Sequence, residues 1–200
     1  MRNLFWAAAS LTATLGFTTA DAAVIDNGAT GISGADVTIG FDEVALTDGT
    51  PVTNQFAGLG VTFSQALTYD NTVSTRPNFS GAAFSNPAGQ AFSILFSQTV
   101  SSASAAITAN SGGATFTSLL NGVEVEGFST SLDLAENNFY GFTGSLFDEI
   151  LIDPDGSTTI AMDNLAYTVA PVPVPAALPL LLAGIGGLGF MARRRRSIRL

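Results

Sequence analysis

Short runs of alternating apolar and polar residues, separated by turn residues, constrain the fold of this chain more than any other feature. In residues 37–41 and 61–63, Val, Ile and Phe alternate with Thr and Gly, and residues 92–97 continue the pattern with Phe92, Ile94 and Phe96. Alternation with a period of two residues is typical of half-buried strands. No segment between residues 24 and 168 shows a convincing 3.6-residue period. We therefore predict an all-β domain over residues 24–168.

The strongest turn signal in this region is Asn121-Gly122, which separates two alternating runs. A type I′ turn needs positive φ at both of its central residues, and Asn-Gly meets that need better than most pairs. The sequence therefore predicts a β-hairpin here. Its register would pair Leu120 with Val123 and Ser118 with Val125.

Further strands are expected at residues 100–108, 139–143, 147–152 and 158–168. About eight short strands in a domain of about 145 residues predict a two-sheet β-sandwich or jelly roll. Twelve of the 15 phenylalanines lie in this domain. We expect their rings to fill the space between the sheets.

The first 23 residues have the features of a secretory signal peptide. Arg2 is a minimal basic start, residues 4–17 are mostly apolar, and Ala20-Asp21-Ala22 fits a small-x-small cleavage pattern. An N-terminal membrane anchor is the alternative. The segment is too short and too rich in Thr and Ser for an anchor, so we predict a signal peptide over residues 1–23.

The C-terminal end has three parts in a fixed order: a Pro-rich linker at residues 169–175, an uncharged apolar run at residues 176–192 and an Arg-rich tail at residues 193–200. Seventeen helical residues span about 25 Å, which is at the short end of what crosses a bilayer. We therefore predict a transmembrane helix over residues 176–192. Arg193, Arg194, Arg195 and Arg196 should hold its end on the cytoplasmic side.

The segment Val172-Pro173-Val174-Pro175-Ala176, followed by the apolar run and the arginines, resembles the PEP-CTERM family of bacterial sorting signals. It is similar to the variant that begins Val-Pro-Leu-Pro-Ala, with Val174 in place of the Leu of that variant and of the Glu that names the family. The resemblance implies transient anchoring in the inner membrane and processing by an exosortase. A single-pass anchor that is never cut is the alternative.

Composition excludes several classes of chemistry. The chain has no Cys, His or Lys, which removes disulfides, thiol nucleophiles, imidazole metal sites and Ser-His-Asp triads. Residues 24–174 hold fifteen of the 16 acidic residues and one base, Arg76, for a net charge of −14. A body this acidic repels nucleic acid, so we expect no nucleic-acid partner. Because no pair of carboxylates stands out as catalytic, we predict that the body is not an enzyme.

Four acidic and amide residues near the two ends of the domain are candidate calcium ligands: Asp42, Glu43, Asp163 and Asn164. The apolar phase of residues 160–167 slips by one residue at Asp163-Asn164, which indicates a bulge. Residues 40–43 and 160–165 are similar to the first and last strands of jelly-roll carbohydrate-binding modules, and that likeness implies a structural Ca²⁺ shared by their acids. Calcium takes six to eight oxygen ligands. The alternative is that these are solvated turn acids.

These patterns together favour an exported structural or adhesive protein, and the resemblance to PEP-CTERM proteins implies the cell surface or extracellular matrix as its setting. A carbohydrate-binding module for exopolysaccharide is the alternative, although the body contains no Trp to stack on a sugar ring. A hydrolase that uses two carboxylates is the third class. Asp153 and Asp155 flank Pro154, and we assign them to a turn rather than to a second metal site.

Overall fold

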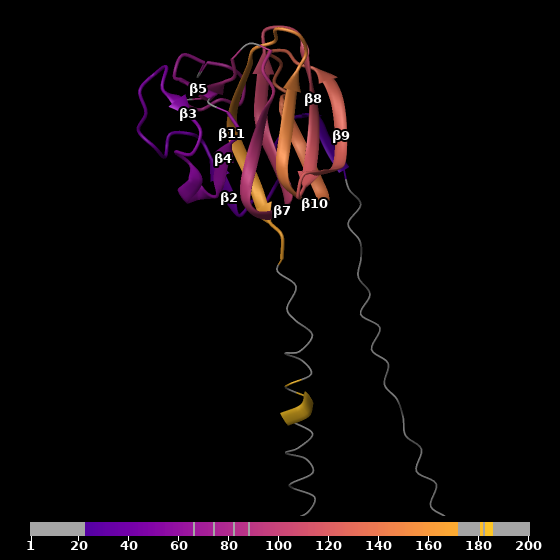
Figure 1. Ribbon diagram of the computed structural model, residues 1–200. Coiled ribbons are helices and arrows are strands. Elements are labelled where there is room, and N and C mark those ends of the chain that lie inside the picture. Colours follow the sequence, from indigo (N-terminus) through magenta and orange to yellow (C-terminus); the bar gives the residue numbers. More distant parts are fainter. Residues whose placement is uncertain are drawn as a thin grey trace, which may run out of the picture. The chain divides into compact units, whose positions relative to one another are not determined.

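The computed structural model describes residues 23–65, 67–73, 75–81, 83–87, 89–171, 181 and 183–185. The chain divides into two compact units, residues 1–169 and residues 170–200. The first unit contains the body, and Figure 1 shows the order of its elements along the chain. The strands of the body are β1 (Ala23–Gly28), β2 (Val37–Ile39), β3 (Pro51–Val52), β4 (Val61–Phe63), β5 (Leu67–Asp70), β6 (Ala83–Ser85), β7 (Phe92–Ala109), β8 (Gly113–Leu120), β9 (Val123–Ser131), β10 (Phe139–Pro154) and β11 (Ile160–Val169), with one 3₁₀ turn, η1 (Ala57–Leu59).

All described strands belong to one antiparallel sheet of eleven strands. Its main path runs β3-β5-β6-β11-β7-β10-β8-β9, while β1 pairs with β10, β2 with β11, and β4 with β7. The predicted all-β class is therefore confirmed. Two separate sheets are not shown, because backbone hydrogen bonds connect every strand to the same sheet.

The sheet doubles back on itself through its two longest strands, β7 and β10. A straight strand of 18 residues, the length of β7, would span about 60 Å. Pro154 ends β10 near the start of β7, because Ile152 pairs with Phe92, whereas Ile160 pairs with Ala109 at the other end of β7. The five residues between Pro154 and Ile160 reach at most about 20 Å. The two ends of β7 must therefore lie close together.

The bend falls where the sequence predicts strand breaks. The inward-facing residues of β7 change phase, from Phe92, Ile94 and Phe96 to Ala103 and Ala105. The pairing of β10 with β7 shifts register between Thr143 and Phe147 and again between Phe147 and Glu149. The predicted strands at residues 139–143 and 147–152 are thus two halves of one bent strand, as are those at 92–97 and 100–108.

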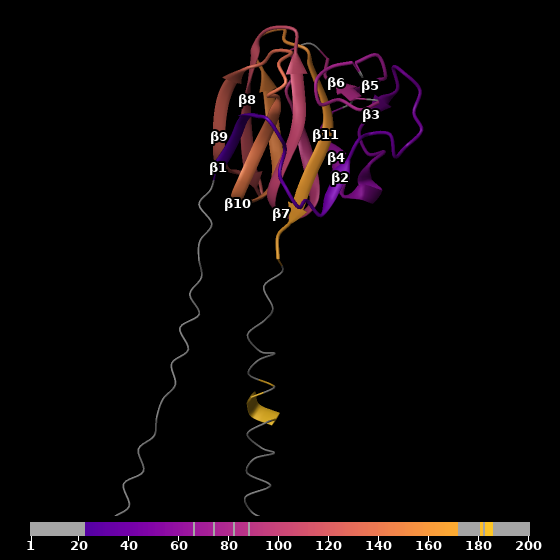
Figure 2. The same cartoon turned by 180° about the vertical axis from the view of Figure 1, so that it is seen from behind.

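The first and last strands of the body begin and end at the bend. Ala23 pairs with Thr143, Thr143 with Ser102, and Ser102 with Thr168, so one row crosses β1, β10, β7 and β11. We call this end of the body the exit pole, and Figure 2 shows β1 and β11 reaching it beside β10 and β7. The opposite end, with the β7–β8 turn and the link between β10 and β11, is the distal pole.

The predicted hairpin forms, with a different register beyond the first pair. Asn121 and Gly122 have φ values of 52° and 76°, as a type I′ turn requires, and Leu120 pairs with Val123. The predicted pairing of Ser118 with Val125 is wrong. Ser118 pairs with Glu126, because a bulge shifts the register between Ser118 and Leu119. Val125 is the extra residue of β9 at this bulge, and its side chain is exposed instead of lying beside the buried Ser118.

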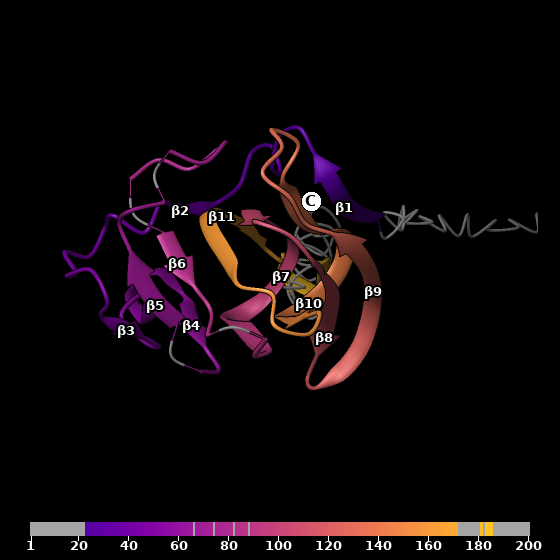
Figure 3. The ribbon, with the colours of Figure 1, turned by 90° about the horizontal axis from the view of Figure 1, so that it is seen from above.

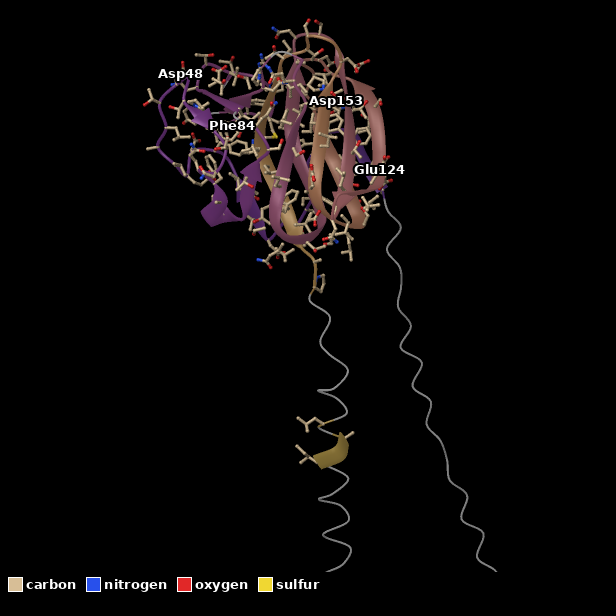
Figure 4. All side chains as sticks on the ribbon, viewed as in Figure 1. Asp48, Phe84, Glu124 and Asp153 are labelled. Atoms are coloured by element: carbon tan, nitrogen blue, oxygen red, sulfur yellow. The ribbon has the colours of Figure 1, made fainter. Side chains whose placement is uncertain are left out.

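The core is built mainly of aromatic rings. Ten of the twelve body phenylalanines are buried, and Phe128 and Phe139 are half-buried. Phe84 is the centre of one group of rings, with centroids between 4.1 and 6.1 Å from those of its neighbours Phe41, Phe56, Phe63 and Tyr69. Figure 3 shows the strands of this group, β4 to β6, gathered on one side of the long strands, and Figure 4 labels Phe84. On the other side, Phe116 stacks between Tyr140 and Phe128.

Candidate functional site

The predicted calcium ligands come from strands that the sheet places next to each other. β2 pairs with β11, with Ile39 opposite Leu165, so Asp42 and Glu43 follow a strand that adjoins Asp163 and Asn164. The predicted bulge is present, because the register of β11 against β7 shifts between Asp163 and Ala166 and Asn164 has a φ of 50°. The expected proximity of the first and last strands is therefore confirmed for β2 and β11.

Asp163 is fully buried, and backbone amides hold its carboxylate. The amide of Ser80 donates a hydrogen bond of 2.7 Å to Oδ2, and the amide of Asn164 donates one of 2.6 Å to Oδ1. Each oxygen keeps a second lone pair for another donor or a cation. The sequence did not point to Ser80, because it lies 83 residues before Asp163 in a segment without strand periodicity.

Asn164 and Glu43 both face Gly40. The side-chain amide of Asn164 donates to the carbonyl of Asn78 at 2.6 Å, and its oxygen accepts from the Ser80 hydroxyl at 3.4 Å. Glu43 folds back so that its Oε1 accepts a hydrogen bond of 2.8 Å from the Gly40 amide. A methyl group built on Gly40 would lie 3.9 Å from both Asn164 Oδ1 and Glu43 Oε1.

The electrostatics of this cluster favour the neutral form of Asp163. The pKa of Asp163 rises from 3.8 to about 7, mainly because the carboxyl group is buried and also because the carboxylates of Asp42 and Glu43 lie nearby. The hydrogen bonds from the amides of Ser80 and Asn164 oppose this rise, because they stabilise the carboxylate. Near neutral pH the site must bind a proton or a cation, or carry a buried charge beside two others.

The four residues lie together but are not arranged as a closed metal site. Among the described residues, no group of three or more His, Cys, Asp or Glu side chains is positioned to hold a metal ion. The carboxylate of Asp42 lies against Gly81, and Glu43 turns toward the Gly40 amide. A bound ion would therefore take Asp163 and Asn164 from β11 and require Glu43 or Asp42 to turn toward them.

The other residues singled out in the sequence have structural roles. Asp155 belongs to a turn, in which its carbonyl accepts a hydrogen bond of 2.7 Å from the Thr158 hydroxyl. The turn assignment of Asp153 is wrong, because Asp153 lies in β10 and pairs with Thr115. Tyr69, Tyr140 and Tyr167 are all buried, at 7%, 2% and 5% exposure. The body therefore presents no exposed tyrosine that could stack on a sugar ring.

The sorting motif at Val172, Pro173, Val174, Pro175 and Ala176 lies outside the described residues, as do Arg193 to Arg196 and most of residues 176–192. Within the described part of the chain, no helix has both the length and the apolar character needed to span a bilayer. The transmembrane helix over residues 176–192 stays a prediction.

Comparison with known proteins gives one result for this end of the chain. Residues 171–196 match the PEP-CTERM protein-sorting motif, which confirms the predicted resemblance. A search of curated proteins found none that matches the chain. The chain therefore carries a PEP-CTERM sorting signal directly after its β body, and such a signal indicates export and processing by an exosortase-type enzyme.

Proposed function

We propose that this protein is a non-catalytic structural or adhesive component of the cell surface or extracellular matrix. The observation that carries the proposal is the order of its parts. A self-contained β body ends at Val169, and the sorting motif begins at residue 171. The signal peptide at residues 1–23 would start export, and the helix at residues 176–192 would hold the body in the inner membrane until the tail is processed.

The surface of the body favours a structural role over sugar binding by stacking. Every tyrosine of the body is buried, and no phenylalanine in the described residues is exposed. Aromatic faces that stack on sugar rings have to be accessible to solvent. Binding of exopolysaccharide at the distal pole, where Asn110, Ser111 and Ser157 line a polar hollow, is the alternative. An array of bacterial polysaccharides, probed with the exported protein, would reveal that binding.

Two tags on one chain test the proposal. One tag is placed after Leu200 and the other beside Asn27, which is exposed in β1. In cells with an exosortase-type enzyme, we expect the first tag to be lost and the second to be found outside the cell. Both tags on one full-length membrane species would instead identify a permanent single-pass anchor.

A structural Ca²⁺ at Asp163 and Asn164, completed by Asp42 and Glu43, is a second proposal for the same body. The fully buried Asp163, with two other carboxylates beside it, favours it. A cation at this place would offset the mutual repulsion of the acids and tie β2 to β11. An ion that binds only the native state stabilises it by about 2.7 kcal/mol at a hundredfold excess over Kd.

Thermal unfolding in calcium and in chelator tests this second proposal. We expect calcium to raise the Tm of the wild-type protein and to have no effect on Asp163→Ala. Asp155→Ala is the control, because Asp155 lies in a turn at the distal pole. A Tm that calcium does not change would leave protonation of Asp163 as the way the cluster is neutralised.

A further inference from the structure

The exit pole concentrates the exposed apolar side chains of the body. Five large hydrophobic residues are exposed among the described residues of the body, and four of them lie at this pole: Val123 at 68%, Leu146 at 50%, Val125 at 43% and Val24 at 39%. The fifth, Leu134, lies at the distal pole, two residues after Leu132, which bonds to Gly112. Single exposed hydrophobic residues are ordinary, but their concentration at one end is not.

Three separate elements hold these side chains at the exit pole. Val123 and Val125 follow the hairpin turn, which is fixed to β10 because the Asn121 amide donates to both carboxylate oxygens of Asp148 at 3.1 Å. Leu146 lies in the bent part of β10, between Thr143 and Phe147, and Val24 is the second residue of β1. The bulge at Val125 and the bend at Leu146 are built into the fold and account for the exposure of these two side chains.

A partly apolar hollow lies at the same pole. It has a volume of about 480 Å³ and lies between the start of β1, the segment after β1 and the bent parts of β7 and β10. Ile25 and Ile32 supply its apolar lining, and Ser101, Ser102 and Thr143 supply hydroxyl groups. The pole therefore offers both projecting apolar side chains and a recess.

Three acidic residues lie at the border of this apolar surface, and we call them the acidic ring: Glu124, Asp148 and Asp36. Glu124 alternates with the two valines on β9, and Figure 4 shows it near the lower end of that strand, while Asp148 lies beside the turn. Asp36 is at the edge of the pole, where it accepts a hydrogen bond from the Val169 amide. The one base of the body, Arg76, binds the Thr108 hydroxyl at 2.8 Å, on the distal half of β7.

The chain leaves the body at this pole and reaches its sorting signal almost at once. Val169 ends β11, the matched motif starts at residue 171, and the apolar run starts at residue 176. The six residues between Val169 and Ala176 extend at most about 20 Å. While the tail is in the membrane, the exit pole is therefore held close to whatever binds the tail there.

We propose that the exit pole docks on the outer face of the membrane-embedded enzyme that processes the tail, at an apolar surface ringed by basic residues. This inference rests on the proposed processing of the tail. The short tether would give the docking contact a high effective concentration, so even a weak contact contributes. Charge complementarity between the acidic ring and a basic rim would fix the orientation in which the linker is presented.

Charge also argues against the two other occupants of this surface. A lipid surface rich in anionic headgroups would repel the acids around the valines, and shallow membrane binding generally uses basic side chains beside the apolar ones. A second copy of the chain would bring a second body with a net charge of −14 against the same acidic ring.

The test compares two sets of substitutions in the full-length protein, in cells with the processing enzyme. The first variant is Val123→Thr, Val125→Thr and Leu146→Gln, which keeps β-branched residues in β9. The control is Leu134→Gln at the distal pole. We measure the rate at which a tag after Leu200 is lost, and we compare the Tm of both variants with that of the wild type.

We expect the triple variant to be processed about fivefold more slowly than the wild type, as for the loss of anchor residues in an interface. The Tm of the triple variant and the processing rate of the control should stay unchanged. Equal rates for all three proteins would overturn the docking proposal. If the wild type itself keeps its tag, the proposed processing fails instead, which separates the two results.

Photo-crosslinking identifies the occupant directly. A photoreactive residue at position 123 should give a product with the epitope-tagged processing enzyme, and the same residue at position 134 should give none. Crosslinks only to lipid, or to a second copy of the chain, would contradict the proposed occupant.

Discussion

The tail and the body of this protein carry their functions in different ways. The signal in the tail is a linear sequence: a proline motif, an apolar run and an arginine block. These parts lie within residues 171–196, which match the PEP-CTERM protein-sorting motif. The body acts through contacts between residues that lie far apart in the chain, such as Ser80 with Asp163. Changes in the tail should therefore alter where the protein goes, and changes in the body should alter how stable it is.

Replacing Arg193 to Arg196 with Gln tests the tail side of this comparison and should have the largest effect. Without the positive block, the signal that fixes the cytoplasmic end of the span is lost. We expect most molecules of this variant to lose their orientation in the membrane or their membrane retention, and therefore not to be processed normally. Fractionation with a tag at each end measures this. An altered Tm of the body in this variant would contradict the view that the tail affects location and not the stability of the body.

Phe84→Ala tests the body side, because Phe84 contacts four other rings and is only 1% exposed. Removing a buried phenylalanine costs about 3–5 kcal/mol of unfolding free energy. Phe128→Ala, at the half-buried end of the stack on β9, should cost less. Urea unfolding measures both. An equal cost for the two would show that the Phe84 cluster is not the main support of the core.

Asp163 predicts a pH dependence that belongs to the body alone. Its pKa is about 7 in the folded protein and 3.8 as the ordinary value, so the folded state holds a proton that the unfolded state releases. The contribution of Asp163 to stability should be largest below about pH 4, fall as the pH rises to about 7, and then stay level. The loss is on the order of 4 kcal/mol. Unfolding titrations between pH 4 and 8 measure it.

Calcium binding would change this pH dependence. A bound cation stabilises the carboxylate form, so the fall in stability between pH 4 and 7 should shrink in millimolar calcium. An equal fall in stability with calcium and with chelator would argue against the calcium proposal. It would still agree with a raised pKa of Asp163. Asp163→Ala removes the titrating group and should flatten this part of the profile under both conditions.

Gly122→Ala should have the smallest effect. Gly122 has a φ of 76°, and an added methyl group would meet no atom within 4 Å. The cost is therefore that of the left-handed backbone alone, about 1 kcal/mol. Gly58→Ala is the control, because its surroundings are equally open and its φ is not in the left-handed region. Thermal unfolding compares the two, and equal Tm values would contradict a type I′ turn.

The sequence was most informative where local chemistry decides the structure. The Asn121-Gly122 turn and the bulge at Asp163-Asn164 follow from backbone preferences and from the phase of a few neighbouring residues. The pairing of Ser118 with Val125 failed because a bulge depends on the partner strand. The bend of β7 was missed for the same reason. Two alternating runs, at residues 92–97 and 100–108, look like two strands until their shared neighbours β10 and β11 are known.

The candidate site was predicted in part. The topology brings Asp42 and Glu43 to Asp163 and Asn164, as the likeness to jelly-roll modules implied. Ser80 and Asn78 could not be found from the sequence, because their hydrogen bonds with Asp163 and Asn164 cross more than eighty residues. Gly81, which lies against the Asp42 carboxylate, gave no signal either. The burial of Asp163, which sets its pKa, likewise depends on strands that no local pattern identifies.

We propose that the sorting signal is cleaved from the chain and that the β body is exported intact. The intact mass of the exported protein tests it most directly, in cells with the processing enzyme and in cells without it. With the enzyme, we expect a species that lacks the signal peptide and ends at or before Ala176. An exported or surface-bound species that retains residues 177–200 in the presence of the enzyme would contradict the account.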